Sequence, residues 1–188
     1  MTRVPTEMVL IGAMLAVVGS ACFAVAAETD KTLVAWVTPD NLTQQGGSAL
    51  TIQSGDRFDA IVFGEKARGR WMAGSNYFRR TQGDQDGYPA ETADADTLVQ
   101  VAIVYDGNRI RIYRNGEPYA AYRTKTENID LLGIANHIAV FGLRHIGAGS
   151  GEPLAGAIED ARIYARALTR TEIASLKPNE PSAIDPLA

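Results

Sequence analysis

The stretch VAIVYDGNRIRIYRNGEPYAAY, residues 101–122, has the pattern of three consecutive β-strands joined by two tight turns. Its apolar positions are filled mainly by β-branched and aromatic residues, which favour strands. The pairs Asp106-Gly107 and Asn115-Gly116 separate the three runs. Such pairs favour two-residue hairpin turns, because Gly adopts positive φ freely and Asn or Asp does so at little cost. The stretch therefore predicts three antiparallel strands.

Isoleucine residues alternate regularly with more polar residues in the middle run. Ile110 and Ile112 alternate with Arg109, Arg111 and Tyr113. Because successive side chains of a strand point to opposite faces, the two isoleucines share one face and the other three residues share the opposite one.

Most of the remaining chain also reads as strands. Short runs rich in β-branched and aromatic residues occupy 32–38, 49–53, 58–64, 97–105, 109–116, 118–124 and 137–144. A single helix is predicted over 168–177, with Thr169 or Thr171 as its N-cap, Glu172 in its first turn and Pro178 as its stop. An all-β chain of this kind, with antiparallel strands and one short C-terminal helix, predicts a two-sheet sandwich.

The N-terminal segment 1–27 has the pattern of a secretory signal peptide. Arg3 supplies a positive start, the chain from Met8 to Ala26 is apolar or small, and small residues offer a cleavage site. The apolar run also has the length of an uncleaved membrane anchor, and Cys22 could instead be lipidated. All three alternatives predict an exported domain that is periplasmic, at the cell surface or extracellular.

Net charge and cysteine content limit the classes of ligand and the kind of stabilisation that this chain can have. The chain carries a net charge of −4, which disfavours binding of nucleic acid or anionic lipid through clustered Lys and Arg. Its one cysteine lies in the N-terminal segment, so the domain predicted over 28–177 must be stable without a disulfide. The segment 178–188 has three prolines and few apolar residues, which predicts a tail or linker.

Three segments together resemble a known family. They are LVAWVTPDNL at 33–42, the hairpin pair at 101–122 and GAIEDARIYARALTRTEIASL at 156–176. In this order they resemble the laminin-G-like, concanavalin A-like lectin/glucanase domains over about residues 31–177. The resemblance implies a jelly-roll sandwich whose last strand returns beside the first and is followed by a short helix.

The resemblance also implies a function. Such domains are mostly non-catalytic modules that bind glycans or proteins, and in secreted bacterial proteins they are commonly attached to glycoside hydrolases. The opening and middle segments resemble modules that precede levanase-type, β-fructosidase-like hydrolases. We therefore expect a module that binds a carbohydrate or glycoconjugate, as the accessory domain of an attached or partner hydrolase. The alternatives are a protein–protein adhesion or structural module, and a hydrolase fragment that lacks its catalytic domain.

The segment 75–96 holds the predicted ligand-binding residues. Exposed aromatic rings stack on the apolar faces of sugars, while Asn and Arg side chains hydrogen-bond to hydroxyl groups. The candidates are Asn76, Tyr77, Arg79, Arg80 and Tyr88. Trp71 and Phe78 are expected in the core, as part of a strand that extends through Phe78.

Acidic residues offer a candidate calcium site. Asp84 and Asp86 lie two apart between glycines, which suits a hard cation, although a solvated turn has the same pattern. The family's closing motif often has Asp where this chain has Glu159, and in some members that residue lies near the calcium, so the resemblance adds Glu159 to the predicted metal ligands.

No catalytic constellation is predicted. A glycosidase needs two carboxylates that flank one bond, and the neighbours Glu159 and Asp160 are expected on opposite faces of a strand, with one of them paired with Arg162 or capping the rim. His137 and His145 are expected at opposite ends of another strand, too far apart to share a metal. The sequence therefore predicts a binding module rather than an enzyme.

Overall fold

The computed structural model describes residues 29–125, 136–147 and 152–186. The predicted signal peptide at 1–27 lies outside the described residues. Among the helices within those ranges, none is long and apolar enough to span a membrane.

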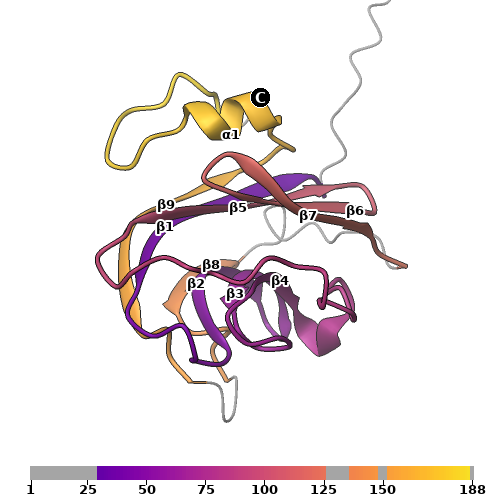
Figure 1. Cartoon of the computed structure of the whole chain (residues 1–188). Coiled ribbons are helices and arrows are strands. Elements are labelled where there is room, and N and C mark those ends of the chain that lie inside the picture. Colours follow the sequence, from indigo (N-terminus) through magenta and orange to yellow (C-terminus); the bar gives the residue numbers. More distant parts are fainter. Residues whose placement is uncertain (1–28, 126–135, 148–151, 187–188) are drawn as a thin grey trace, which may run out of the picture.

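The described residues form two antiparallel sheets that face each other (Figure 1). The five-stranded sheet has the order β7-β6-β5-β1-β9, and the four-stranded sheet has the order β4-β3-β2-β8. The strands are β1 (Lys31–Pro39), β2 (Gly47–Ser54), β3 (Arg57–Phe63), β4 (Trp71–Ser75), β5 (Val99–Asp106), β6 (Arg109–Arg114), β7 (Glu117–Arg123), β8 (Ile138–Gly142) and β9 (Gly156–Tyr164). The predicted two-sheet jelly-roll sandwich is therefore confirmed.

The hairpin pair of β5, β6 and β7 has the predicted form. Strand β6 pairs antiparallel with both neighbours. Gly107, Asn115 and Gly116 adopt positive φ values of 55°, 50° and 75° in the two turns. Ile110 and Ile112 lie in the core between the sheets, whereas Tyr113 lies on the outer face. These positions confirm the alternation predicted for this strand.

Strand β9 pairs with β1, so the last strand returns beside the first, as the family resemblance implied. The helix α1 (Arg170–Ser175) follows and lies on the outer face of the five-stranded sheet (Figure 1). Thr169 caps it, because its side chain accepts a hydrogen bond from the Glu172 amide while the Glu172 carboxylate accepts one from the Thr169 amide. Ile173 packs with Trp36 in a second apolar cluster beneath the helix.

The segment after α1 is bound to the domain as far as the structure describes it. Arg162 donates hydrogen bonds to the carbonyl oxygens of Lys177 and Glu180, at 2.6 and 2.9 Å. Ala165 donates a backbone hydrogen bond to Pro186, and Ile184 packs against the cluster beneath α1. Residues 178–186 are therefore held against the sandwich by hydrogen bonds and by Ile184, although most of their side chains are exposed.

The outer face of the four-stranded sheet is also apolar. Phe58, Ala60, Val62 and Met72 form a small buried cluster on this face. Strand β4 ends at Ser75 and the chain turns sharply over residues 76–78. The predicted continuation of the strand through Phe78 is wrong, because Tyr77 and Phe78 both adopt left-handed backbone conformations that a strand cannot contain.

Candidate functional site

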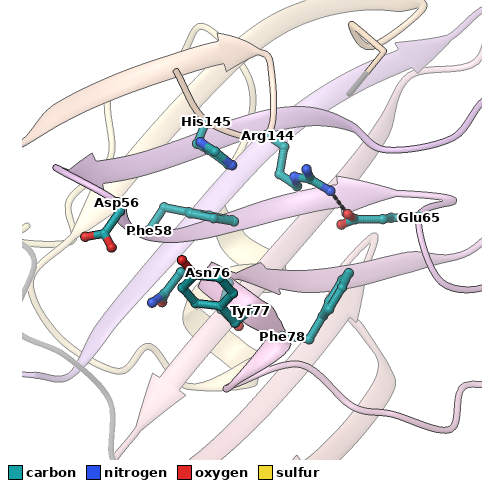
Figure 2. Close-up of a pocket in the computed structure, with 9 residues that line it drawn as sticks. Asp56, Phe58, Glu65, Asn76, Tyr77, Phe78, Arg144 and His145 are labelled. Carbon is teal, nitrogen blue, oxygen red and sulfur yellow. Dashed lines mark ion pairs between the residues drawn. The ribbon is translucent and has the colours of Figure 1, made fainter. Parts of the chain in front are cut away.

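A pocket of about 280 Å³ lies over the outer face of the four-stranded sheet, and Figure 2 shows the side chains around it. We call it the aromatic pocket. Arg144 and His145 lie on one side of Phe58, and the turn that carries Tyr77 and Phe78 lies on the other (Figure 2). The lining residues are Asp56, Phe58, Glu65, Ser75, Asn76, Tyr77, Phe78, Arg144 and His145.

The floor of the aromatic pocket is a stacked ring pair. Phe58 is buried, and its ring stacks on that of His145 with centroids 4.7 Å apart and an interplanar angle of 27°. Strand β2 holds the loop that carries His145. The Thr51 hydroxyl donates to the carbonyl of Arg144 at 2.9 Å, and the Gln53 carboxamide accepts from the Ile146 amide at 2.8 Å.

Tyr77 and Phe78 are displayed by a strained turn. Their φ angles are 52° and 55°, in the left-handed region that residues with a Cβ atom rarely adopt. Tyr77 is 79% exposed and Phe78 is 41% exposed. The Arg79 guanidinium lies 5.7 Å from the Tyr77 ring centroid, and the Lys66 ammonium lies 4.6 Å from that of Phe78. Strain of this kind persists only where the surroundings hold it, and it is concentrated at functional sites.

Arg80 is the anchor of this turn. Its side chain is only 3% exposed and donates to Asp59 at 2.8 Å and to the Phe58 carbonyl at 2.9 Å. It also donates to the Asn76 carboxamide at 3.3 Å, and its amide donates to the Ser75 hydroxyl at 2.9 Å. The prediction that Arg80 contacts a ligand is therefore corrected. Its guanidinium group is buried and already hydrogen-bonded within the protein, and it holds the turn from beneath.

Asp59 forms a second ion pair, with Lys31. The Lys31 ammonium lies 3.0 Å from Asp59, and both side chains are buried. The same ammonium lies 4.7 Å from the Tyr105 ring centroid. Burial raises the pKa of the Tyr105 hydroxyl, and the charge of Asp59 raises it further. Lys31 and Arg80 therefore both form ion pairs with one buried carboxylate. The pair with Arg80 fixes the residue that follows the strained turn and so helps to hold that turn in place.

Charged groups at the other edge of the aromatic pocket form one ion pair, between Arg144 and Glu65. Burial lowers the pKa of Arg144. Within the described residues, the Glu65 Oε2 atom is buried and has no hydrogen-bond partner.

The structure distributes the predicted ligand residues among four environments. Asn76 and Tyr77 line the aromatic pocket. Arg79 is exposed beside Tyr77, whereas Arg80 is buried. Tyr88 lies elsewhere, half-buried, with its ring edge-on to Tyr119 at 5.7 Å.

Tyr88 is not displayed for a ligand. It packs against the core, and burial, followed by the influence of Tyr119, raises the pKa of its hydroxyl. The loop around it is fixed by Glu91, whose carboxylate accepts hydrogen bonds from Trp71 at 2.8 Å and from Arg114 at 2.6 and 2.9 Å. The prediction of an exposed Tyr88 is corrected for this reason. Trp71 is fully buried, as expected.

The predicted metal ligands do not converge. Asp84 accepts a hydrogen bond from the Asp86 amide at 3.0 Å, which is the geometry of a local turn. Glu159 lies on β9 and accepts from the Asn179 carboxamide at 2.5 Å. Across residues 29–125, 136–147 and 152–186, no three His, Cys, Asp or Glu residues are grouped closely enough to hold a metal ion. Calcium binding stays a prediction from the sequence.

The two carboxylates of β9 are arranged differently from the prediction. The pairing of β9 with β1 shifts register at this point, since Trp36 faces Asp160 and Val37 faces Ile158. A bulge of this kind breaks strict alternation. The Asn179 amide donates to Asp160 and its carboxamide donates to Glu159, so both carboxylates reach one residue. Asp160 pairs with Arg162 at 2.7 Å, as expected.

Several lining residues of the aromatic pocket were missed from the sequence. In the run FDAIVF at 58–63, Phe58, Ala60 and Val62 share one wholly apolar face while Ile61 and Phe63 lie on the other, and this signal could have indicated that the outer face is also apolar. Arg144 and His145 carried no such signal, because their place depends on hydrogen bonds from the distant strand β2.

Solved structures with the same fold include three sugar-related proteins. The CBM40 of Ruminococcus gnavus IT-sialidase bound to alpha2,3 sialyllactose has a TM-score of 0.54 and 17% identity, covering 80% of this chain and 84% of that one. Domain 4 of AbnA, an extracellular GH43 arabinanase of Geobacillus stearothermophilus in complex with arabinotriose, has a TM-score of 0.55 and 17% identity, with 78% and 65% covered. A putative carbohydrate binding protein of Bacteroides ovatus has the same TM-score of 0.55 and 17% identity, with 78% and 40% covered.

This chain therefore spans less than two thirds of the length of the latter two. No curated protein sequence matches the chain. The family model of laminin G type, in contrast, matches residues 17–174. That match covers most of the chain and agrees with the sandwich and its β1–β9 pairing, so the chain belongs to the concanavalin A-like lectin/glucanases superfamily.

Proposed function

We propose that the chain is a carbohydrate-binding module and that the aromatic pocket is its ligand site. The observation that carries this proposal is Tyr77, an aromatic side chain that is 79% exposed and is held in a left-handed conformation at the edge of a pocket. A ring exposed to this degree buries little in the free protein. A strained backbone that displays it therefore needs a reason other than stability.

The chemistry of the aromatic pocket suits a sugar. The apolar face of a pyranose or furanose ring stacks on an aromatic face such as that of Tyr77. Asn76 provides both donor and acceptor atoms, and the Asp56 carboxylate is an acceptor for hydroxyl groups. An apolar platform bordered by a few polar groups is the usual composition of a small-molecule site.

The similar structures support the same proposal. Two of them are described as modules or domains in complex with saccharides, namely sialyllactose and arabinotriose, and a third as a carbohydrate binding protein. On this basis we propose that the chain acts as an exported accessory domain that brings a glycoside hydrolase to its polymer. The apolar run from Met8 to Ala26 supports export, and a levanase-type partner remains the narrower form of the proposal.

Binding to a panel of polysaccharides and oligosaccharides tests the proposal directly. The panel includes arabinan, levan and sialyllactose, each measured by affinity electrophoresis or calorimetry with the purified chain. We expect saturable binding that Tyr77→Ala weakens at least about tenfold, because truncation of a central aromatic contact commonly costs more than about 1.4 kcal/mol. Tyr77→Phe should retain most of it, since the ring face is unchanged.

Phe141→Ala is the matched control, because Phe141 is a 54% exposed aromatic residue outside the aromatic pocket. It should bind like the wild type. Binding that is lost equally in Phe141→Ala and Tyr77→Ala, or competition by a protein but by no sugar, would instead support an adhesion module.

A further inference from the structure

A second pocket, of about 230 Å³, lies where the turn after Tyr77 meets the end of β7. It is lined by Arg79, Thr81, Gln82 and residues 122–125. We call it the basic pocket, because Arg79, Arg123 and Lys125 give it three cationic side chains. Its lining, as far as the structure describes it, includes no carboxylate. Such a concentration of positive charge stands out in a chain whose net charge is −4.

The sheet pairing places a fourth cationic residue, Arg109, next to the lining residue Arg123. Arg123 on β7 faces Arg109 on β6 as its direct cross-strand partner. Like charges directly opposite each other on a sheet are destabilising. Asp106 faces Arg109 from β5, but its carboxylate is ion-paired with Arg111 at 3.0 Å. The Arg123 guanidinium donates to the neutral carboxamide of Asn108 at 2.6 Å, so that hydrogen bond does not neutralise its charge.

Arg79 connects the two pockets. Its guanidinium lies 5.7 Å from the centroid of the Tyr77 ring, which lines the aromatic pocket, and its side chain also lines the basic pocket. Arg80, the next residue, is fixed by Asp59, so the backbone that carries Arg79 is held in place. The Tyr122 hydroxyl donates to the Arg80 carbonyl at 2.8 Å, which ties this turn to β7 beside the basic pocket.

We propose that the basic pocket binds the oxyanion group of an acidic glycan, a carboxylate or a sulfate, while a neighbouring sugar ring of the same chain stacks on Tyr77. Arginine forks match the geometry of carboxylate and sulfate oxygens, and charge-assisted hydrogen bonds are stronger than neutral ones. Thr124 also lines the pocket, where its hydroxyl donates to the Asn108 carbonyl at 3.3 Å. The stacking half of this inference rests on the proposed function, whereas the oxyanion half rests on the basic pocket alone.

The test compares acidic polymers with neutral counterparts, using the whole purified chain. Polygalacturonate and its fully methyl-esterified form isolate the carboxylate, and dextran sulfate and dextran isolate the sulfate. We expect one acidic polymer to bind at least about tenfold more tightly than its neutral form, since a tenfold ratio requires only about 1.4 kcal/mol and charge-assisted hydrogen bonds are stronger than neutral ones. The preferred polymer identifies the oxyanion.

The decisive variant is Arg123→Gln/Lys125→Gln, which removes two charges from exposed positions. It should abolish the preference for the acidic polymer and flatten the dependence of affinity on salt, while melting like the wild type. Lys177→Gln is the matched control, because Lys177 is an exposed cation outside the basic pocket, and it should bind as the wild type does.

The outcomes separate this inference from the proposed function. Binding that depends on Tyr77 but is equal for acidic and neutral polymers would overturn the inference and leave the proposed function standing. Binding of an acidic polymer that needs Arg123 and Lys125 but not Tyr77 would support oxyanion binding in the basic pocket. It would contradict sugar stacking on Tyr77 in the aromatic pocket. An acidic preference that survives in Arg123→Gln/Lys125→Gln would overturn the assignment to the basic pocket.

Discussion

Glu91 and Arg114 form a two-pronged ion pair at the side of the sandwich, with Arg114 nitrogen atoms 2.6 and 2.9 Å from the two carboxylate oxygens. The Glu91 side chain is fully buried. The same carboxylate accepts hydrogen bonds from the Trp71 indole and from the amides of Thr92 and Ala93. One residue thus links the loop before β5 to both sheets.

This arrangement predicts a specific sensitivity to acid. Burial alone would raise the pKa of Glu91, but the hydrogen bonds from Arg114, Trp71 and the two amides outweigh burial and lower it from 4.5 to about 2. Because the folded pKa is depressed, the stabilisation is complete above about pH 4.5 and is lost as the pH falls toward 2. The loss should be on the order of 3 kcal/mol.

Urea unfolding of the wild type and Glu91→Gln between pH 6 and pH 2.5 measures this contribution. Other carboxylates titrate in the same range, so the informative quantity is the difference between the two proteins. That difference should shrink as the pH falls. A difference that is constant across the range would show that the ion pair does not contribute in this way.

The neighbouring residues Arg79 and Arg80 provide a matched pair for stability. Arg80→Ala removes a buried partner of Asp59, and breaking a buried ion pair costs about 3–5 kcal/mol. Lys31 still lies 3.0 Å from Asp59, so we expect the lower end of that range. Arg79→Ala, at an exposed position, should change the free energy of unfolding by less than about 0.5 kcal/mol. Equal losses in the two variants, measured by urea unfolding, would contradict the anchoring role of Arg80.

Two threonines, the N-cap Thr169 and Thr171 within α1, test the capping box in the same way. Thr169→Ala removes the hydroxyl that accepts from the Glu172 amide and should lower the free energy of unfolding by about 1 kcal/mol. Thr171 is exposed within the helix, so Thr171→Ala should be neutral or slightly stabilising, since Ala is the better helix former. Thermal unfolding of the two variants distinguishes them, and a larger loss in Thr171→Ala would contradict this N-cap.

Local patterns predicted much of the fold. Ile110 and Ile112 alternate with polar neighbours, Asn115-Gly116 forms a tight turn, and Thr169 precedes a helix with Glu172 three residues later. Each signal lies within a few residues, and the structure confirms each. The family resemblance supplied the pairing of β9 with β1, which no local pattern contains.

The site was less predictable, because it depends on partners far apart in the sequence. Arg79 and Arg80 are equivalent by composition, and only the position of Asp59 beneath the turn makes one buried and the other exposed. The bulge at Glu159 changes which way a carboxylate points, and it arises from the pairing with β1 rather than from the local sequence. His145 joins the aromatic pocket through Phe58, which the sequence alone could not place opposite it.

Substitutions of Tyr77 in the strained turn distinguish an effect on stability from an effect on glycan binding. Tyr77 has a φ of 52°, which costs a residue with a Cβ atom roughly 1 kcal/mol and costs Gly almost nothing. Tyr77→Gly should therefore be more stable than Tyr77→Ala by about 0.5–1 kcal/mol, although Gly loses more entropy on folding. Both variants should lose glycan binding, because both lack the ring.

Gly55→Ala supplies a reference for the backbone effect alone, since Gly55 has a φ of 59° and no atom stands within 4 Å of an added Cβ. The cost of Gly55→Ala should match the difference between Tyr77→Ala and Tyr77→Gly. Urea unfolding gives all of these values, and binding to the preferred glycan gives the functional readout. If Tyr77→Gly were the less stable of the two Tyr77 variants, the left-handed turn would not be strained. If Tyr77→Gly still bound the glycan, the ring would not be the platform on which the sugar stacks.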